Sequence, residues 1–112
     1  MYAIKANEKK LNGQIVPTFE RNVAEPRTVL KVEAGTTGYK GLCREAGGRT
    51  YFKLECRIGD FFFSPMVYKR NGKKEVYGIE IATCGDAGLE AITKALQFAL
   101  DAINDQRYEA EV

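Results

Sequence analysis

The chain has 112 residues, of which 45% are hydrophobic and 29% charged, and its net charge is only +2. This composition is typical of one soluble globular domain with a single hydrophobic core, and no apolar run approaches the roughly 20 residues of a membrane span. The sequence also contains no histidine, which excludes Ser–His and Cys–His nucleophile pairs and the usual zinc sites. We therefore expect a non-enzymatic protein without a metal ion or cofactor.

The N-terminus and the cysteines indicate the compartment. Residues 1–5 lack the long apolar segment of a signal peptide, so the cytoplasm is the expected location. Cys43, Cys56 and Cys84 are odd in number and widely spaced, which favours reduced thiols over a disulfide framework.

The first part of the chain, residues 1–27, is predicted to be an N-terminal hairpin or extension. Asn12-Gly13 is a two-residue hairpin signal, and it would join strands near 2–11 and 14–20. Pro17 suits an edge strand better than a central one. Residues 28–34 alternate between apolar and polar side chains, which predicts the first strand of the main sheet.

Turn signals then recur at a fixed interval. Gly47-Gly48, Gly59-Asp60 and Asn71-Gly72 are hairpin pairs, each twelve residues after the last. They predict an antiparallel meander over residues 28–83. Its further strands are expected at about 37–46, 49–58, 61–70 and 73–82.

One irregularity is required for the apolar side chains of this meander to share a face. Strict pairing across Asn71-Gly72 would place Ile79 on the face opposite Phe63. A β-bulge at Ser64-Pro65, where proline would otherwise cost a ladder hydrogen bond, restores the common face. With this bulge, the common face carries Phe52, Leu54, Cys56, Ile58, Phe61, Phe63, Met66, Tyr68, Tyr77, Ile79 and Ile81.

Residues 86–105 form the predicted helix, and residues 106–112 a tail. Asp86 is a suitable N-cap residue. Apolar residues recur at three- and four-residue spacing and define the face expected to cover the sheet. These residues are Leu89, Ile92, Leu96, Ala99, Leu100 and Ile103. The predicted fold class is α+β: an antiparallel β-meander of four to six strands with one long C-terminal helix packed on one face.

The charges are distributed unevenly along the chain. Residues 37–74 hold nine Lys/Arg and three Asp/Glu, a net of +6, whereas residues 75–112 hold two and eight, a net of −6. The second face of the meander interleaves basic and aromatic side chains, which is the combination that binds phosphates and stacks on bases of single-stranded nucleic acid. A solvated face of mixed charge is the simpler interpretation of each residue alone. The candidate nucleic-acid-binding residues are Lys40, Arg44, Tyr51, Lys53, Arg57 and Lys69.

Four meander strands followed by a helix resemble the repeat of Whirly and Pur-type single-stranded-DNA-binding proteins. Tyr39-Lys40-Gly41-Leu42 resembles the Lys-Gly-Lys element of Whirly proteins, with Leu42 in place of the second lysine. The resemblance covers the topology of residues 37–105 and implies nucleic-acid binding on the strand face and assembly through helices or edges. Three strands and a helix are also similar to the double-stranded-RNA-binding domain, but Gly85-Asp86-Ala87-Gly88 stands where that family has a Lys-Lys cluster.

The alternative function is a protein-interaction or homo-oligomeric assembly module. Leu42, Phe62 and Val67 are apolar residues on the second face of the sheet, which favours self-association. The charge asymmetry would also let the basic sheet of one copy meet the acidic helix of another. In a competing arrangement, the N-terminal segment of the same chain covers these apolar residues.

Overall fold

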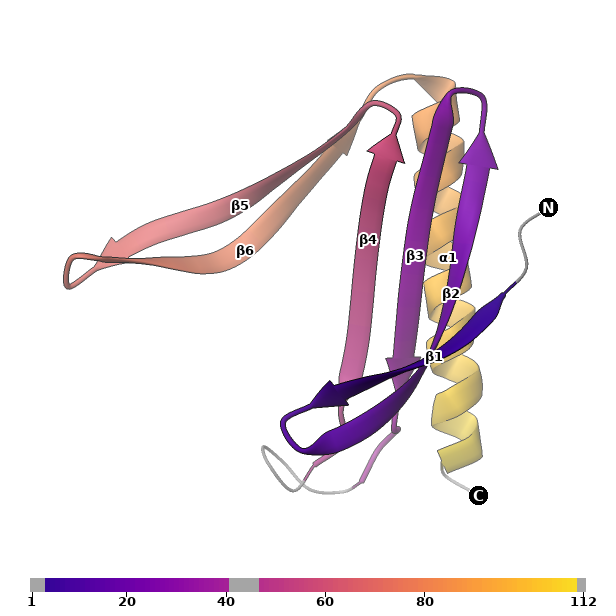
Figure 1. Cartoon of the computed structure of the whole chain (residues 1–112), viewed down its shortest axis with the longest axis vertical. Coiled ribbons are helices and arrows are strands. Elements are labelled where there is room, and N and C mark those ends of the chain that lie inside the picture. The colour runs from indigo at the N-terminus through magenta and orange to yellow at the C-terminus, as the bar shows by residue number, and fades with distance from the viewer. Residues whose placement is uncertain (1–3, 41–46, 111–112) are drawn as a thin grey trace.

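The computed structural model describes residues 4–40 and 47–110, which form six antiparallel strands and one C-terminal helix (Figure 1). The predicted α+β fold class is confirmed. The elements are β1 (Lys5–Leu11), β2 (Gln14–Glu25), β3 (Thr28–Thr36), β4 (Thr50–Ile58), β5 (Phe61–Arg70), β6 (Lys73–Thr83) and α1 (Gly85–Ala110). The helix is not long and apolar enough to cross a membrane, and it is the only helix in the described ranges.

The strands form two sheets rather than one continuous meander. A four-stranded sheet has the order β1-β2-β3-β4, and among the described strands β5 pairs with β6 alone. Gly59-Asp60 therefore does not close a hairpin, and the chain leaves β4 there with Gly59 at φ 135°. A hydrogen bond from Thr83 Oγ1 to the carbonyl of Asp60, 2.9 Å long, joins the two ends of the departing hairpin. We call this β5–β6 hairpin the arm, because it projects away from the rest of the molecule (Figure 1).

The two Asn-Gly turns close hairpins as predicted. Asn12-Gly13 and Asn71-Gly72 both have positive φ at the two central residues, which fits the right-handed twist of paired strands. The Gly47-Gly48 turn is a wrong prediction, because β3 extends to Thr36 and pairs directly with β4. Residues 37–40 are not a strand, and the rest of the strand expected over 37–46 lies outside the described residues.

The arm contains a bulge, but it lies on β6 and not at Ser64-Pro65 of β5, where the pairing is regular. The register shifts between Met66 and Val67, where Tyr77 of β6 is the extra residue. Phe63 pairs with Ile81 and Pro65 with Ile79, so Phe63 and Ile79 share a face as expected. Met66 and Tyr68 instead lie on the other face. Ile58 also leaves the common face, because a second register shift pairs it with Val29.

The helix packs on β3 and β2 through small side chains rather than through its leucines. Ala91, Ala95 and Ala99 are at most 4% exposed and lie against the core of Val23, Leu30, Val32 and Ala34. Of the residues predicted to cover the sheet, Ala99 is buried, Ile92 and Ile103 are half-buried, and Leu89, Leu96 and Leu100 are 50–60% exposed. The leucines are exposed because the sheet ends at β4, and the strands expected beneath them form the arm instead.

The N-terminal hairpin folds over the face of the sheet opposite α1. Figure 1 shows β1 and the start of β2 crossing the ends of β3 and β4. Arg49 donates hydrogen bonds to the carbonyls of Leu11 (3.2 Å) and Asn12 (3.3 Å) at the hairpin turn. A side chain at Gly35 would collide with the backbone of Pro17 and Thr18, so glycine permits this close crossing.

The side chain of a buried glutamine takes the place of backbone ladder hydrogen bonds where β2 and β3 diverge. Gln106 of α1 donates from Nε2 to the carbonyl of Pro17 (2.8 Å) and accepts at Oε1 from the amide of Thr36 (2.9 Å). Pro17 pairs with Glu8 of β1, but the ladder between β2 and β3 begins only at Phe19. The side chain of Gln106 therefore satisfies two backbone groups that would otherwise be unpaired. Residue 106 was expected in the tail, but the helix extends through it.

Candidate nucleic-acid interface

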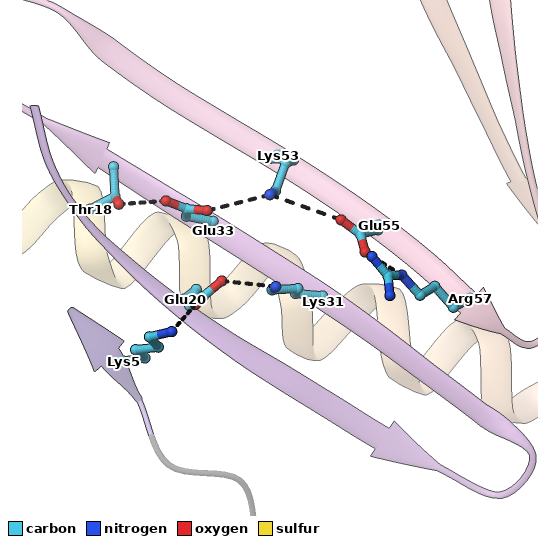
Figure 2. Close-up of polar contacts among 8 residues, drawn as sticks. All are labelled: Lys5, Thr18, Glu20, Lys31, Glu33, Lys53, Glu55 and Arg57. Atoms are coloured by element: carbon cyan, nitrogen blue, oxygen red, sulfur yellow. Dashed lines mark hydrogen bonds and ion pairs between the residues drawn. The ribbon is translucent and has the colours of Figure 1, made fainter. Parts of the chain in front are cut away.

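The outer face of the four-stranded sheet carries a ladder of alternating charges (Figure 2). Glu33 is only 2% exposed, accepts a 2.6 Å hydrogen bond from Thr18 Oγ1, and lies 3.5 Å from Lys53 Nζ. Lys53 also lies 3.9 Å from Glu55, which accepts a 2.8 Å hydrogen bond from Arg57 Nε. The candidate residues Lys53 and Arg57 thus lie on one face, but carboxylates of the same face neutralise much of their charge.

A second carboxylate on this face is held by cations on both sides. Glu20 Oε2 lies 3.3 Å from Lys31 Nζ, and Glu20 Oε1 lies 3.8 Å from Lys5 Nζ (Figure 2). A hydrogen bond from the Asn7 side chain and the two lysines lower the pKa of Glu20 below its ordinary value, against the opposing effect of burial. Glu20 therefore remains charged and contributes to the structure of the ladder.

Tyr51 extends the same face, but one side of its ring is already occupied. Lys9 of β1 places its Nζ 5.4 Å from the ring centroid, within cation–π range. The N-terminal hairpin supplies this cation, so it covers the Tyr51 end of the face. It does not cover Phe62 and Val67 of the arm, which are 61% and 43% exposed.

Lys69 is exposed and lies next to the Asn71-Gly72 turn that ends the arm. The arm projects away from the four-stranded sheet (Figure 1). The neighbours of Lys69 there are Arg70, Lys73 and Lys74, paired across the Asn71-Gly72 turn. None of these four cations forms an ion pair with another described residue. Arg44 lies outside the described residues.

Lys40 lines a surface hollow of about 400 Å³ on the helix side of the sheet. We call it the tyrosine hollow, because Tyr39 lies beside Lys40 with its side chain 65% exposed. The guanidinium carbon of Arg107 lies 5.8 Å from the centroid of the Tyr39 ring, and Arg107 Nη1 donates to Tyr39 Oη at 3.3 Å. The lining residues are Thr36, Gly38, Tyr39, Lys40, Gly48, Thr50 and Arg107.

Short hydrogen bonds fix the floor of the tyrosine hollow. The hydroxyls of Thr36 and Thr50 are 2.8 Å apart, and Thr36 Oγ1 accepts from the amide of Gly38 at 3.0 Å. A side chain at Gly48 would collide with the carbonyl oxygen of Gly38, so glycine is needed for the two segments to approach. The hollow thus combines an exposed ring, two cations and hydroxyl groups on a braced backbone.

Sequence reasoning identified Lys40 but not Tyr39 or Arg107 as site residues. Tyr39 stands next to Lys40 in the segment that resembles the Whirly element, so its position was a usable signal. Arg107 is 68 residues away from Tyr39 along the chain, and no local pattern connects the two. Only the packing of α1 on β3 brings them together.

Other chemistry is sparse in the part of the chain that the structure describes. No three His, Cys, Asp or Glu side chains there are grouped as metal ligands. Burial raises the pKa of the Cys56 thiol, which disfavours the reactive thiolate. No protein-family model matches the chain, and no curated protein or solved structure matches it either.

Proposed function

We propose that this protein binds single-stranded nucleic acid, DNA or RNA, through the tyrosine hollow. The observation that carries the proposal is the 65% exposed ring of Tyr39 beside Arg107 and Lys40. An exposed aromatic ring stacks on a base of any sequence, and nearby cations bind the flanking phosphates. This role agrees with the cytoplasmic location expected from the sequence.

The dimensions of the hollow favour a single strand over a duplex. Its volume of about 400 Å³ falls within the range of small-molecule sites and suits one unstacked nucleotide. The bases of a duplex are stacked on each other, so the Tyr39 ring has access only to bases of a single strand. Thr50 is exposed and adds a hydroxyl that can bond to a base edge or to a ribose. The buried hydroxyl of Thr36, in contrast, is already engaged by Gly38, Arg49 and Thr50.

The ladder face contributes less to binding in this proposal. Lys53 and Arg57 are engaged by Glu33 and Glu55, so a phosphate must compete with carboxylates that are already in place. Tyr51 and Tyr39 each have a cation over one side of the ring, Lys9 and Arg107 respectively. Tyr39, however, is 65% exposed, whereas Tyr51 is half-buried. We therefore assign the main stacking contact to Tyr39.

The test is the affinity for a labelled single-stranded oligonucleotide, of DNA and of RNA, across a salt series. Tyr39→Ala is expected to weaken binding roughly 5- to 150-fold, the equivalent of about 1–3 kcal/mol for one stacked base, whereas Tyr39→Phe retains the stacking. Tyr77→Ala is the matched control, because Tyr77 is 62% exposed but lies on the arm. Lys40→Gln is expected to reduce the slope of log affinity against log salt by about 0.7, one phosphate contact on a single strand.

Two results would overturn the proposal. One is the absence of binding at about 50 mM salt, where phosphate contacts are strong. The other is binding that Tyr39→Ala leaves unchanged. If Tyr51→Ala weakens binding instead, the binding surface is the ladder face.

A second candidate function is homo-oligomeric assembly. The observation that favours it is the exposure of large apolar side chains on the arm and on α1, including Ile79 (62%) and Leu89 (60%). Assembly and nucleic-acid binding would use different surfaces of the same chain.

A further inference from the structure

A single copy of the chain exposes far more surface than its mass requires. Its accessible surface is 8077 Å², whereas a compact monomer of 12.5 kDa has roughly 6,200 Å². Its radius of gyration is 16.1 Å, against roughly 13 Å for a compact domain of this length. The excess of roughly 1,900 Å² corresponds to what each partner of a large, stable interface buries.

The arm contributes to this excess, because no residue of β5 or β6 is buried. Phe61 and Phe63, at its base, pack against the hydrophobic core. The same face continues outward through Val67, Val76 and Ile79, which are 43%, 68% and 62% exposed. An isolated two-stranded hairpin is marginally stable in water, so an apolar face of this length requires a cover.

The complementary surface is the flank of α1 that carries Leu89, Leu96 and Leu100. The opposite flank faces β2, because Lys94, Phe98 and Asp101 line a hollow together with residues of β2. The leucine flank therefore lies toward β4, where Arg107 meets Thr50 at the tyrosine hollow. The edge of β4 next to this flank has no strand partner among the described residues.

We propose that two copies of this chain exchange arms. The Val67, Val76 and Ile79 face of each arm covers the leucine flank of the other copy's α1, beside the free edge of its β4. Each copy has one such face and one such flank, so the exchange closes as a two-fold symmetric dimer. The arm of the same copy does not cover this flank, because the chain leaves β4 at Gly59-Asp60 and the arm projects away from α1 (Figure 1).

Charge supports a second copy as the occupant. The arm holds four Lys/Arg and two Asp/Glu, whereas residues 85–107 of the helix hold two and four. Two arms of net charge +2 would repel each other, whereas the helix has a net charge of −2, which favours arm with helix over arm with arm. Two of the helix acids, Asp101 and Asp105, line hollows on the β2 side, so the charge opposes an arm-to-arm contact and does not supply ion pairs on the leucine flank. The basic arm tip then faces protein in the dimer. The arm covers the helix as far as Leu100, about 10 Å along the helix axis before Arg107 of the tyrosine hollow.

The first test is the mass in solution. Sedimentation at micromolar concentration is expected to give twice the 12.5 kDa of one chain. Ile79→Lys is expected to weaken the dimer roughly a hundredfold or more, because the new charge would be buried in an apolar contact. Ile15→Lys is the matched control, since Ile15 is 60% exposed on the N-terminal hairpin, and it leaves the dimer intact. A wild-type monomer at these concentrations would overturn the proposal.

The second test identifies the contact by disulfide trapping. One chain carries Ile79→Cys and another Leu96→Cys, in a background with Cys43→Ser, Cys56→Ala and Cys84→Ser, and the two are refolded together. A disulfide is expected in the mixture and not in either variant alone, nor when Ile15→Cys replaces Ile79→Cys. Efficient trapping of Leu96→Cys alone would instead mean helix against helix and would overturn the exchange. Tyr39→Ala leaves the dimer unchanged, so this result is independent of nucleic-acid binding.

Discussion

The two Asn-Gly hairpins of this chain, β1–β2 and β5–β6, close with the same turn but pack differently. The first folds over the sheet and is joined to it by Arg49, whose side chain bonds to the turn carbonyls of Leu11 and Asn12. The second forms the arm, where no large side chain is fully buried. Turn chemistry thus determines a hairpin and its twist, whereas long-range contacts determine what the hairpin covers.

The largest difference between the two regions is expected at buried backbone groups. Gln106→Leu leaves the Pro17 carbonyl and the Thr36 amide without partners, so it should lower the free energy of unfolding by about 2–4 kcal/mol. On the arm, Tyr68→Phe removes the exposed 2.6 Å bond to Glu75 and should cost less than about 1 kcal/mol. Urea denaturation of both variants measures the two values. Equal losses of unfolding free energy in the two variants would contradict the contrast between the four-stranded sheet with its helix and the exposed arm.

The next largest effect is expected when the same valine-to-alanine truncation is made in β3 and in the arm. Val32→Ala in β3 removes two fully buried methyl groups and should cost about 2–3 kcal/mol. Val76→Ala in β6, where the side chain is 68% exposed, should cost less than about 0.5 kcal/mol in the monomeric Ile79→Lys background. In the wild-type chain, a larger cost for Val76→Ala is expected only if arm exchange buries it. Thermal unfolding of the wild type, Val32→Ala, Val76→Ala, Ile79→Lys and the Ile79→Lys/Val76→Ala double variant separates these cases.

The smallest expected effect is a pH dependence of stability that comes from the four-stranded sheet and not from the arm. Because the pKa of Glu20 is lowered from its ordinary value of 4.5, its contribution to stability is present above that pH and is lost as the pH falls through the folded-state pKa. Stability measured by urea denaturation should therefore decline below about pH 5 more steeply in the wild type than in Glu20→Gln. Identical profiles would mean that the contacts of Glu20 with Asn7, Lys31 and Lys5 do not favour its charged form.

The sequence by itself determined the local elements of this protein. Alternation predicted most strands, Asn-Gly pairs predicted both of the hairpins they close, and the face shared by Phe63 and Ile79 required a bulge that the structure has. These features depend on residues close together in the chain, so the pattern of side chains and the backbone preferences of Asn and Gly were sufficient.

Only the tertiary structure decided which surfaces are buried and which residues meet. Small side chains at Ala91 and Ala95 bring α1 close to β3, and the leucines predicted for the core lie beyond the edge of the sheet because β5 does not follow β4. The tyrosine hollow depends on the same packing, since Tyr39 and Arg107 are 68 residues apart. Alternation in the sequence identifies the apolar face of a strand, which can be covered. The element that covers it is determined by contacts between segments far apart in the chain, and no local pattern encodes these contacts.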